Sequence, residues 1–218
     1  RSGDFNLFVM SETIQEVTEN LGDPRATLFF RESSNNPGQF LGLLNGPDAS
    51  SNSISVADFS LAGTMFRENT GVLDANFMTS WETGFLLAEA AERNLITADA
   101  QTLYEEAVSQ SFEYWNATMP ADYLVNGEAS YGINGNDPIE QILTQKWLSN
   151  IINGYEGWIE YRRTGFPVLK TVSASLNEGL IPARMPYPAD EAALNASNYA
   201  TATAENSNSV NAKVWWNR

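Results

Sequence analysis

The sequence contains no cysteine and no histidine among its 218 residues. Without cysteine there is no disulfide and no thiol nucleophile, and without both residue types there is no Cys/His zinc site. The lack of histidine also removes a His-based catalytic triad and an imidazole general base. We predict no metal site and no cofactor.

Basic residues are scarce relative to acidic ones. The chain has 12 Lys and Arg against 27 Asp and Glu, which gives a formal net charge of −15 at pH 7. Because nucleic acids and anionic bilayers attract basic surfaces, we expect no nucleic-acid partner and no direct docking on a membrane. A neutral ligand such as a sugar is compatible with this charge, and so is a simple role in solubility. No run of about 18 apolar residues is present, so no membrane-spanning segment is expected.

Composition and apolar periodicity predict a folded, mainly α protein. Hydrophobic residues make up 43% of the chain and include six Trp, as a globular core requires. Apolar residues recur at helical spacing in several stretches, and no repeated short alternation supports a large sheet. We therefore predict a single domain over residues 1–218. Its fold class is mainly α, with tetratricopeptide-like helical pairs packed with long irregular loops and few or no strands.

The clearest helical pair is predicted over residues 79–115. In the first helix the small residues Ala88 and Ala91 allow close contact with a neighbour. Thr97 is expected to cap the second helix, with Asp99 near its positive end. A helix–turn–helix of about 34 residues is typical of a tetratricopeptide unit.

A second pair of helices is predicted over residues 134–167. Asp137 suits an N-cap, and Pro138 suits the first helical position, where a missing N–H costs nothing. The Asn153-Gly154 dipeptide interrupts the pattern, and a shorter helix follows. Gly165 is expected to end that helix in the left-handed conformation.

The remaining segments carry weaker patterns. A helix is predicted to begin at Ser11, and a turn is predicted to lead into an extended run over residues 26–30. Residues 59–76 are predicted to be irregular connecting structure. Residues 168–218 show little periodicity and many turn residues. Within them, residues 181–199 are predicted to be extended, fixed by proline and wrapped back over the helices, and the closing Val214-Trp215-Trp216 is predicted to dock on the core.

The loop predicted over residues 119–137 holds the candidate ligand-binding residues. Aromatic rings beside amides suit sugar binding, because a ring face stacks on C–H groups while polar side chains bond hydroxyls. The candidates are Tyr123, Tyr131, Asn126, Asn134 and Asn136. The alternative is that the two tyrosine rings anchor the loop to the core.

The string QKWLSNIINGYEGWIEYRRTGFPVL, residues 145–169, resembles the carboxy-terminal signature of the SusD-like (SusD/RagB) family. Further similarities are the DPR turn at 23–25, FLLAEAAERN in the first helix of the 79–115 pair, the R–PYP–E–LN spacing from Arg184, and the terminal VWW. Trp81 departs from the tyrosine expected in many relatives. We name the matched positions the signature residues: Lys146, Trp147, Tyr155, Glu156, Trp158, Glu160, Arg162, Arg163 and Arg184.

The resemblance implies a cell-surface lipoprotein of the bacterial outer membrane that captures oligosaccharides or other polymer fragments. It would pass them to a SusC-like TonB-dependent transporter and would not be an enzyme. The chain would be the carboxy-terminal half of such a protein, with membrane attachment only through a lipid anchor outside it. The signature residues are expected to be structural, and the arginines among them are expected to pair with Glu156 and Glu160.

Two other functions remain open from the residues alone. A glycoside hydrolase needs two carboxylates, one with a raised pKa, and Asp122 with Glu128 or Glu156 with Glu160 are possible pairs. A tetratricopeptide-type adaptor that binds peptides is the second alternative. Release of reducing ends would indicate the hydrolase, and peptide binding without sugar binding would indicate the adaptor.

Overall fold

A computed structural model describes residues 8–46, 54–68, 76–170, 172 and 174–217. Across these residues the regular structure is helical, and pairing between extended segments is limited to three isolated bridges, Val9–Leu61, Ser11–Leu43 and Phe30–Ala62. The predicted mainly α class with few or no strands is confirmed.

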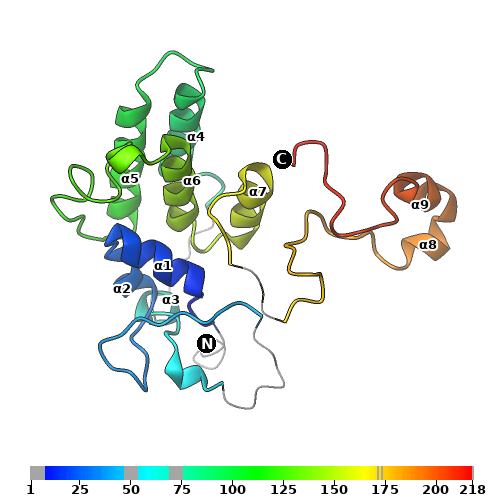
Figure 1. Cartoon of the computed structure of the whole chain (residues 1–218), viewed down its shortest axis with the longest axis horizontal. Helices are drawn as coiled ribbons and strands as arrows, with labels where there is room; N and C mark the ends of the chain where they lie inside the picture. Colours follow the sequence, from blue (N-terminus) through cyan, green and yellow to red (C-terminus); the bar gives the residue numbers. More distant parts are fainter. Residues whose placement is uncertain (1–7, 47–53, 69–75, 171, 173, 218) are drawn as a thin grey trace.

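Among the described residues the helices follow one another from α1 to α9, with the short 3₁₀ turns η2 and η3 in the loops. Their bounds are α1 Glu12–Leu21, α2 Arg25–Phe29, η2 Val56–Asp58, α3 Thr64–Glu68, α4 Ser80–Glu92, α5 Ala100–Tyr114, η3 Ile133–Gly135, α6 Pro138–Ser149, α7 Gly154–Thr164, α8 Glu191–Leu194 and α9 Ala196–Thr203. Helices α4, α5 and α6 stand side by side, α7 lies beside them, and α1–α3 lie near one end of the group (Figure 1).

Helices α4 and α5 form the predicted tetratricopeptide-like pair. Thr79 caps α4 by accepting a hydrogen bond from the backbone N–H of Glu82 at 3.3 Å. A Cβ added at Gly84 would lie 2.9 Å from the Cβ of Ala107, so glycine is what allows this close approach of the two helices. Ala88 is fully buried nearby, as expected of a small residue at the crossing.

The second helix of the pair begins later than predicted. Asp99, not Thr97, is the N-cap, and its carboxylate accepts a hydrogen bond from the N–H of Thr102 at 2.7 Å. Thr97 lies exposed in the connection between the two helices. Thr and Asp are both good N-cap residues. Asp99 takes the role because it lies closer to the first buried residue of α5, Tyr104.

The signals at the ends of α6 and α7 are confirmed. Asp137 accepts a hydrogen bond from the N–H of Ile139 at 2.9 Å, and Pro138 occupies the first helical position. Asn153 caps α7, and Gly165 ends it with φ of 84°. These features could be predicted from the sequence because each depends on residues only a few positions apart.

Two short helices replace segments predicted to be extended or irregular. Residues 26–30 were expected to be extended, but α2 covers most of them, with the Asp23 carboxylate accepting from the N–H of Arg25 at 2.9 Å. The segment 59–76 contains α3, whose Phe66 ring stacks against Phe29 of α2 at 5.8 Å. Five-residue helices are too short to be stable alone, so tertiary packing decides their conformation.

The carboxy-terminal segment does not wrap back over the helices. After its first contacts with α7 it runs away from the helical body and carries α8 and α9, which lie at its far end (Figure 1). Of the predicted docking residues, Trp216 contacts Arg162 of α7, while Trp215 is 95% exposed. The prolines keep the stretch before α8 mostly extended as predicted, but α8 and the first half of α9 are helical where the chain was expected to be extended.

Two apolar clusters fill the helical body. The larger lies between α4, α5 and α6, and includes Phe85, Tyr104 and Ile142. The smaller joins Phe29 of α2, Trp115 after α5 and Leu148 of α6. No helix in the described part of the chain has both the length and the apolar content needed to cross a bilayer.

Candidate ligand-binding site

Tyr123, the first predicted aromatic of the loop, lies in the core. It is 2% exposed, its hydroxyl donates to Asp23 at 2.5 Å, and it accepts from the amide of Gln145 at 2.8 Å. Burial, together with the neighbouring Asp23 carboxylate, raises the pKa of Tyr123 well above its ordinary value. The ring therefore offers no face to a sugar, and the alternative that it anchors the loop holds for this residue.

Tyr131 is half-buried at the other end of the loop. Its hydroxyl donates to the Glu92 carboxylate, and its ring lies 5.5 Å from the buried ring of Tyr104. Burial, followed by the hydrogen bond to Glu92, raises the pKa of Tyr131. Tyr131 thus connects the loop to α4 and α5 and keeps only part of its ring surface accessible.

The three predicted asparagines are exposed, but they do not gather at one point. Asn134 donates to the Glu128 carboxylate at 3.3 Å within the loop, and Asn126 lies apart in the turn before it. Asn136 lines a groove that neither Asn126 nor Asn134 lines. Of the five predicted ligand residues, Asn136 is therefore the one that the structure places in a cavity beside this loop.

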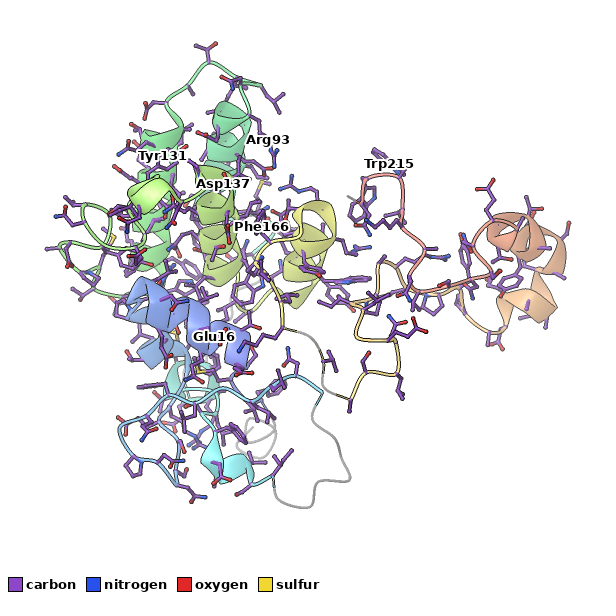
Figure 2. All side chains as sticks on the ribbon, viewed as in Figure 1. Glu16, Arg93, Tyr131, Asp137, Phe166 and Trp215 are labelled. Carbon is purple, nitrogen blue, oxygen red and sulfur yellow. The ribbon has the colours of Figure 1, made fainter. Side chains whose placement is uncertain are left out.

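This groove has a volume of about 630 Å³ and lies between α1, the loop and α6. Figure 2 shows Glu16 on α1 and Asp137 at the start of α6, and both line it. One wall of the groove is the loop of residues 119–137, which Gln141 of α6 fixes in place. The Gln141 side chain accepts from the N–H of Gly132 at 2.7 Å and donates to the carbonyl of Ser130 at 2.9 Å. Amides, hydroxyls and carboxylates share the lining with aliphatic side chains such as Val17, Leu21 and Val168. The groove can therefore bond hydroxyl groups of a ligand but presents little aromatic surface.

A buried network beneath the loop was not predicted from the sequence. Arg25 is fully buried, and its guanidinium donates to Asp23 at 2.6 Å, Gln145 at 2.8 Å and Ser111 at 2.8 Å. Burial alone would lower the pKa of Arg25, but the Asp23 carboxylate outweighs it and the pKa is raised. The Asp23-Pro24-Arg25 sequence predicted only a turn. The network was missed because the partners of Arg25 lie far along the chain, on α5 and α6.

Several signature residues form a second network between α4, α6 and α7. The ammonium of Lys146, 2% exposed, lies 3.3 Å from carboxylate oxygens of both Glu156 and Glu160. Arg163 contacts Glu160 at 2.9 Å and bonds both oxygens of Glu89 on α4, at 2.8 and 2.6 Å. The expected pairing of Arg163 with Glu160 is confirmed, and Glu89 is an additional partner.

Arg162 departs from the expected carboxylate pairing. Its guanidinium lies over the Trp158 ring at 3.7 Å from the centroid and over the Trp216 ring at 4.6 Å, and it donates to the carbonyl of Ala183 at 3.0 Å. Trp158 also donates, to the carbonyl of Pro182 at 2.9 Å. Stacked rings and backbone carbonyls replace the carboxylate here, and these contacts attach the carboxy-terminal segment to α7.

The other signature residues differ in exposure. Trp147 packs against the smaller apolar cluster, and Arg184 lies over the Tyr187 ring at 4.6 Å from its centroid. Tyr155 on α7 is 69% exposed. The signature therefore contains both buried and exposed residues, and the spacing of its residues does not show which are buried.

Comparison with known proteins identifies the class of this helical protein. The family described as "Starch-binding associating with outer membrane", a SusD-like family, matches residues 1–188, and the chain belongs to it. No match is found among curated proteins.

Solved structures resemble the whole helical body. The chain is similar to a chitin-binding protein, with 25% identity and a TM-score of 0.76 over 95% of this chain and 49% of that one. A SusD homologue from Bacteroides vulgatus has 25% identity and a TM-score of 0.80, covering 96% and 49% of the two chains. A SusD homologue from Bacteroides uniformis has 27% identity and a TM-score of 0.80, covering 95% and 49%. The chain spans about half the length of these structures.

Proposed function

We propose that this chain is part of a non-catalytic, cell-surface lipoprotein of the outer membrane that binds neutral oligosaccharides. Membership of a family described as starch-binding and associated with the outer membrane carries the proposal. Similarity to a structure named as a chitin-binding protein supports a ligand built of sugar rings. A lipid anchor would lie outside this chain, and a SusC-like TonB-dependent transporter would take up the captured ligand.

The charges of the chain fit a neutral ligand. With a net charge of −15, the surface repels polyanions, whereas hydroxyl groups of an uncharged glycan can donate to exposed carboxylates and amides. The groove beside α1 and α6 offers such groups in Asn136, Asp137 and Glu140. Binding of this kind has little dependence on ionic strength.

The carboxylate pairs considered for a hydrolase are poorly placed for catalysis. Glu160 is 3% exposed and contacts both Lys146 and Arg163, so it is committed to the network between helices. Of the other pair, Glu128 lines the groove and Asp122 does not. Since glycoside hydrolysis needs two carboxylates across one sugar linkage, these arrangements favour capture without cleavage.

Incubation with maltoheptaose and with chitohexaose separates binding from hydrolysis. These probes represent the two glycans named for the family and for a similar structure. We expect saturable binding of at least one probe and no increase in reducing ends over a prolonged incubation. An increase in reducing ends that Glu128→Gln abolishes would contradict the proposal in favour of a hydrolase.

The transporter partner has its own test. When the natural protein is purified from outer membranes in mild detergent, we expect a TonB-dependent transporter to co-purify with it in a constant ratio. Recovery of the protein in the soluble fraction without membrane treatment would contradict both the anchor and the partner.

A further inference from the structure

A cavity of about 330 Å³ lies where α4 begins and where α5 and α6 end. The segment before α4, the last turn of α5 and the link between α6 and α7 all line it. Small-molecule pockets typically measure about 300–1,000 Å³, so this one suits a short part of an oligosaccharide. The loop of residues 119–137 leads into the opposite end of α6. At a rise of about 1.5 Å per residue, the 12 residues of α6 separate the two places by about 18 Å.

The cavity presents aromatic surface that the groove lacks. Phe77 is fully exposed at 106%, and Tyr114 is 36% exposed at the end of α5. The Tyr114 ring is held from two sides, at 4.4 Å from the Trp81 centroid and at 4.9 Å, edge-on, from the Trp115 centroid. The held Tyr114 ring is a surface on which the C–H face of a sugar can stack at little cost in entropy, and Phe77 adds an exposed ring beside it.

Polar groups surround these rings. Asn76 donates to the Tyr114 hydroxyl at 2.8 Å, and the Asn150 carbonyl accepts from the Trp81 indole at 3.2 Å. The Asn150 amide nitrogen is buried and has no hydrogen-bond partner among the described residues, and such a donor gains free energy when an acceptor arrives. Glu82 adds a carboxylate to the same lining.

We infer that this cavity binds a pyranose unit of a neutral glycan. Phe77 and Tyr114 contact its C–H face, while the amides of Asn76 and Asn150 and the Glu82 carboxylate bond its hydroxyls. The inference rests on the proposed glycan binding and assigns that binding to this end of the helices, not to the loop of residues 119–137. Aromatic rings combined with amides and a single carboxylate are the side chains that recognise uncharged sugars.

Two exposed aromatic residues provide a matched test. Phe77→Ala removes an exposed ring at the edge of the cavity, and Trp215→Ala removes a similarly exposed ring on the carboxy-terminal segment (Figure 2). Neither ring is buried, so both variants should fold. The full chain and each variant are titrated with maltoheptaose and chitohexaose by calorimetry. We expect Phe77→Ala to weaken binding about three- to tenfold and Trp215→Ala to leave it unchanged.

Asn76→Ala and Asn136→Ala give a second matched pair, because both residues are exposed amides and each lines one of the two sites. Weaker binding by Asn76→Ala alone supports the cavity. If the unaltered chain binds a probe and Phe77→Ala and Asn76→Ala bind it equally tightly, the cavity assignment is wrong and the proposed function stands. If the unaltered chain binds neither probe, both are overturned.

Discussion

At the scale of single residues, Arg25 connects parts of the chain that lie far apart in sequence. Its guanidinium contacts Asp23 two residues away, Ser111 at a separation of 86 residues and Gln145 at a separation of 120. Tyr123 joins through Asp23, so the loop of residues 119–137 is attached to the same network. A fully buried guanidinium is stable here because carboxylate, hydroxyl and amide groups accept its hydrogen bonds.

Removal of this buried charge should destabilise the fold strongly. We expect Arg25→Met to lower the free energy of unfolding by about 3–5 kcal/mol, because Asp23 would remain buried without a cation. Urea unfolding followed by tryptophan fluorescence measures the change. Arg67→Met is the matched control, since Arg67 pairs with exposed Glu68 and should contribute less than about 1 kcal/mol. Similar losses in the two variants would contradict a special role for Arg25.

The residues of the candidate site were only partly predictable, because their surroundings also come from parts of the chain far apart in sequence. The loop of residues 119–137 was identified from its composition, but whether its rings face water depends on partners more than ten residues away. The buried hydroxyl of Tyr123 donates to Asp23 and accepts from the amide of Gln145, and no local pattern encodes these distant partners. The cavity of Phe77 and Tyr114 was missed because its walls come from three separate helix ends.

At the scale of elements, the quality of the sequence predictions follows the range of the interactions. The start of α6 and the end of α7 were predicted, because Asp137 and Gly165 act on residues within one turn. Helices α2 and α3 were missed, because five residues form a helix only when tertiary contacts such as Phe29–Phe66 hold them.

The start of α5 gives a test of the corrected cap. Hydrogen bonds from Thr102 lower the pKa of Asp99. Asp99→Ala should therefore lower the thermal midpoint of unfolding, because the first turn of α5 loses its acceptor. Thr97→Ala, which alters a cap candidate that lies outside the helix, should leave the midpoint unchanged. Equal midpoints for the two variants would contradict the assignment of Asp99.

The attachment of α7 to α4 predicts a dependence of stability on pH. Burial by itself raises the pKa of Glu89, but hydrogen bonds from Arg163 and Arg93 outweigh it, and the pKa lies below its ordinary value of 4.5. A lowered pKa in the folded state means that the stabilisation is fully present above pH 4.5 and is lost as pH falls through the lower folded value.

Glu89→Gln isolates this contribution. The difference in free energy of unfolding between the unaltered chain and the variant should be largest near neutral pH and should shrink below pH 4.5, where Glu89 becomes protonated. Urea titrations over a pH series measure it. A difference that stays constant into the acid range would show that the charge on Glu89 does not hold α7 to α4.

At the scale of the whole molecule, the helical body and the carboxy-terminal segment differ. The body holds both apolar clusters. The segment touches α7 through Pro182 and Ala183 before α8 and α9, and again through Trp216 after them. Similar structures are about twice as long as this chain. That residues 1–218 form one domain of a longer SusD-like protein remains a prediction.

The central claim is that the protein binds a neutral glycan, and calorimetric titration with maltoheptaose and chitohexaose tests it most directly. We expect saturable binding of at least one glycan, with an affinity that changes less than about twofold between about 50 and 500 mM salt, because no charge on the ligand is screened. Absence of binding to both glycans, or binding that collapses as salt rises, would contradict the account.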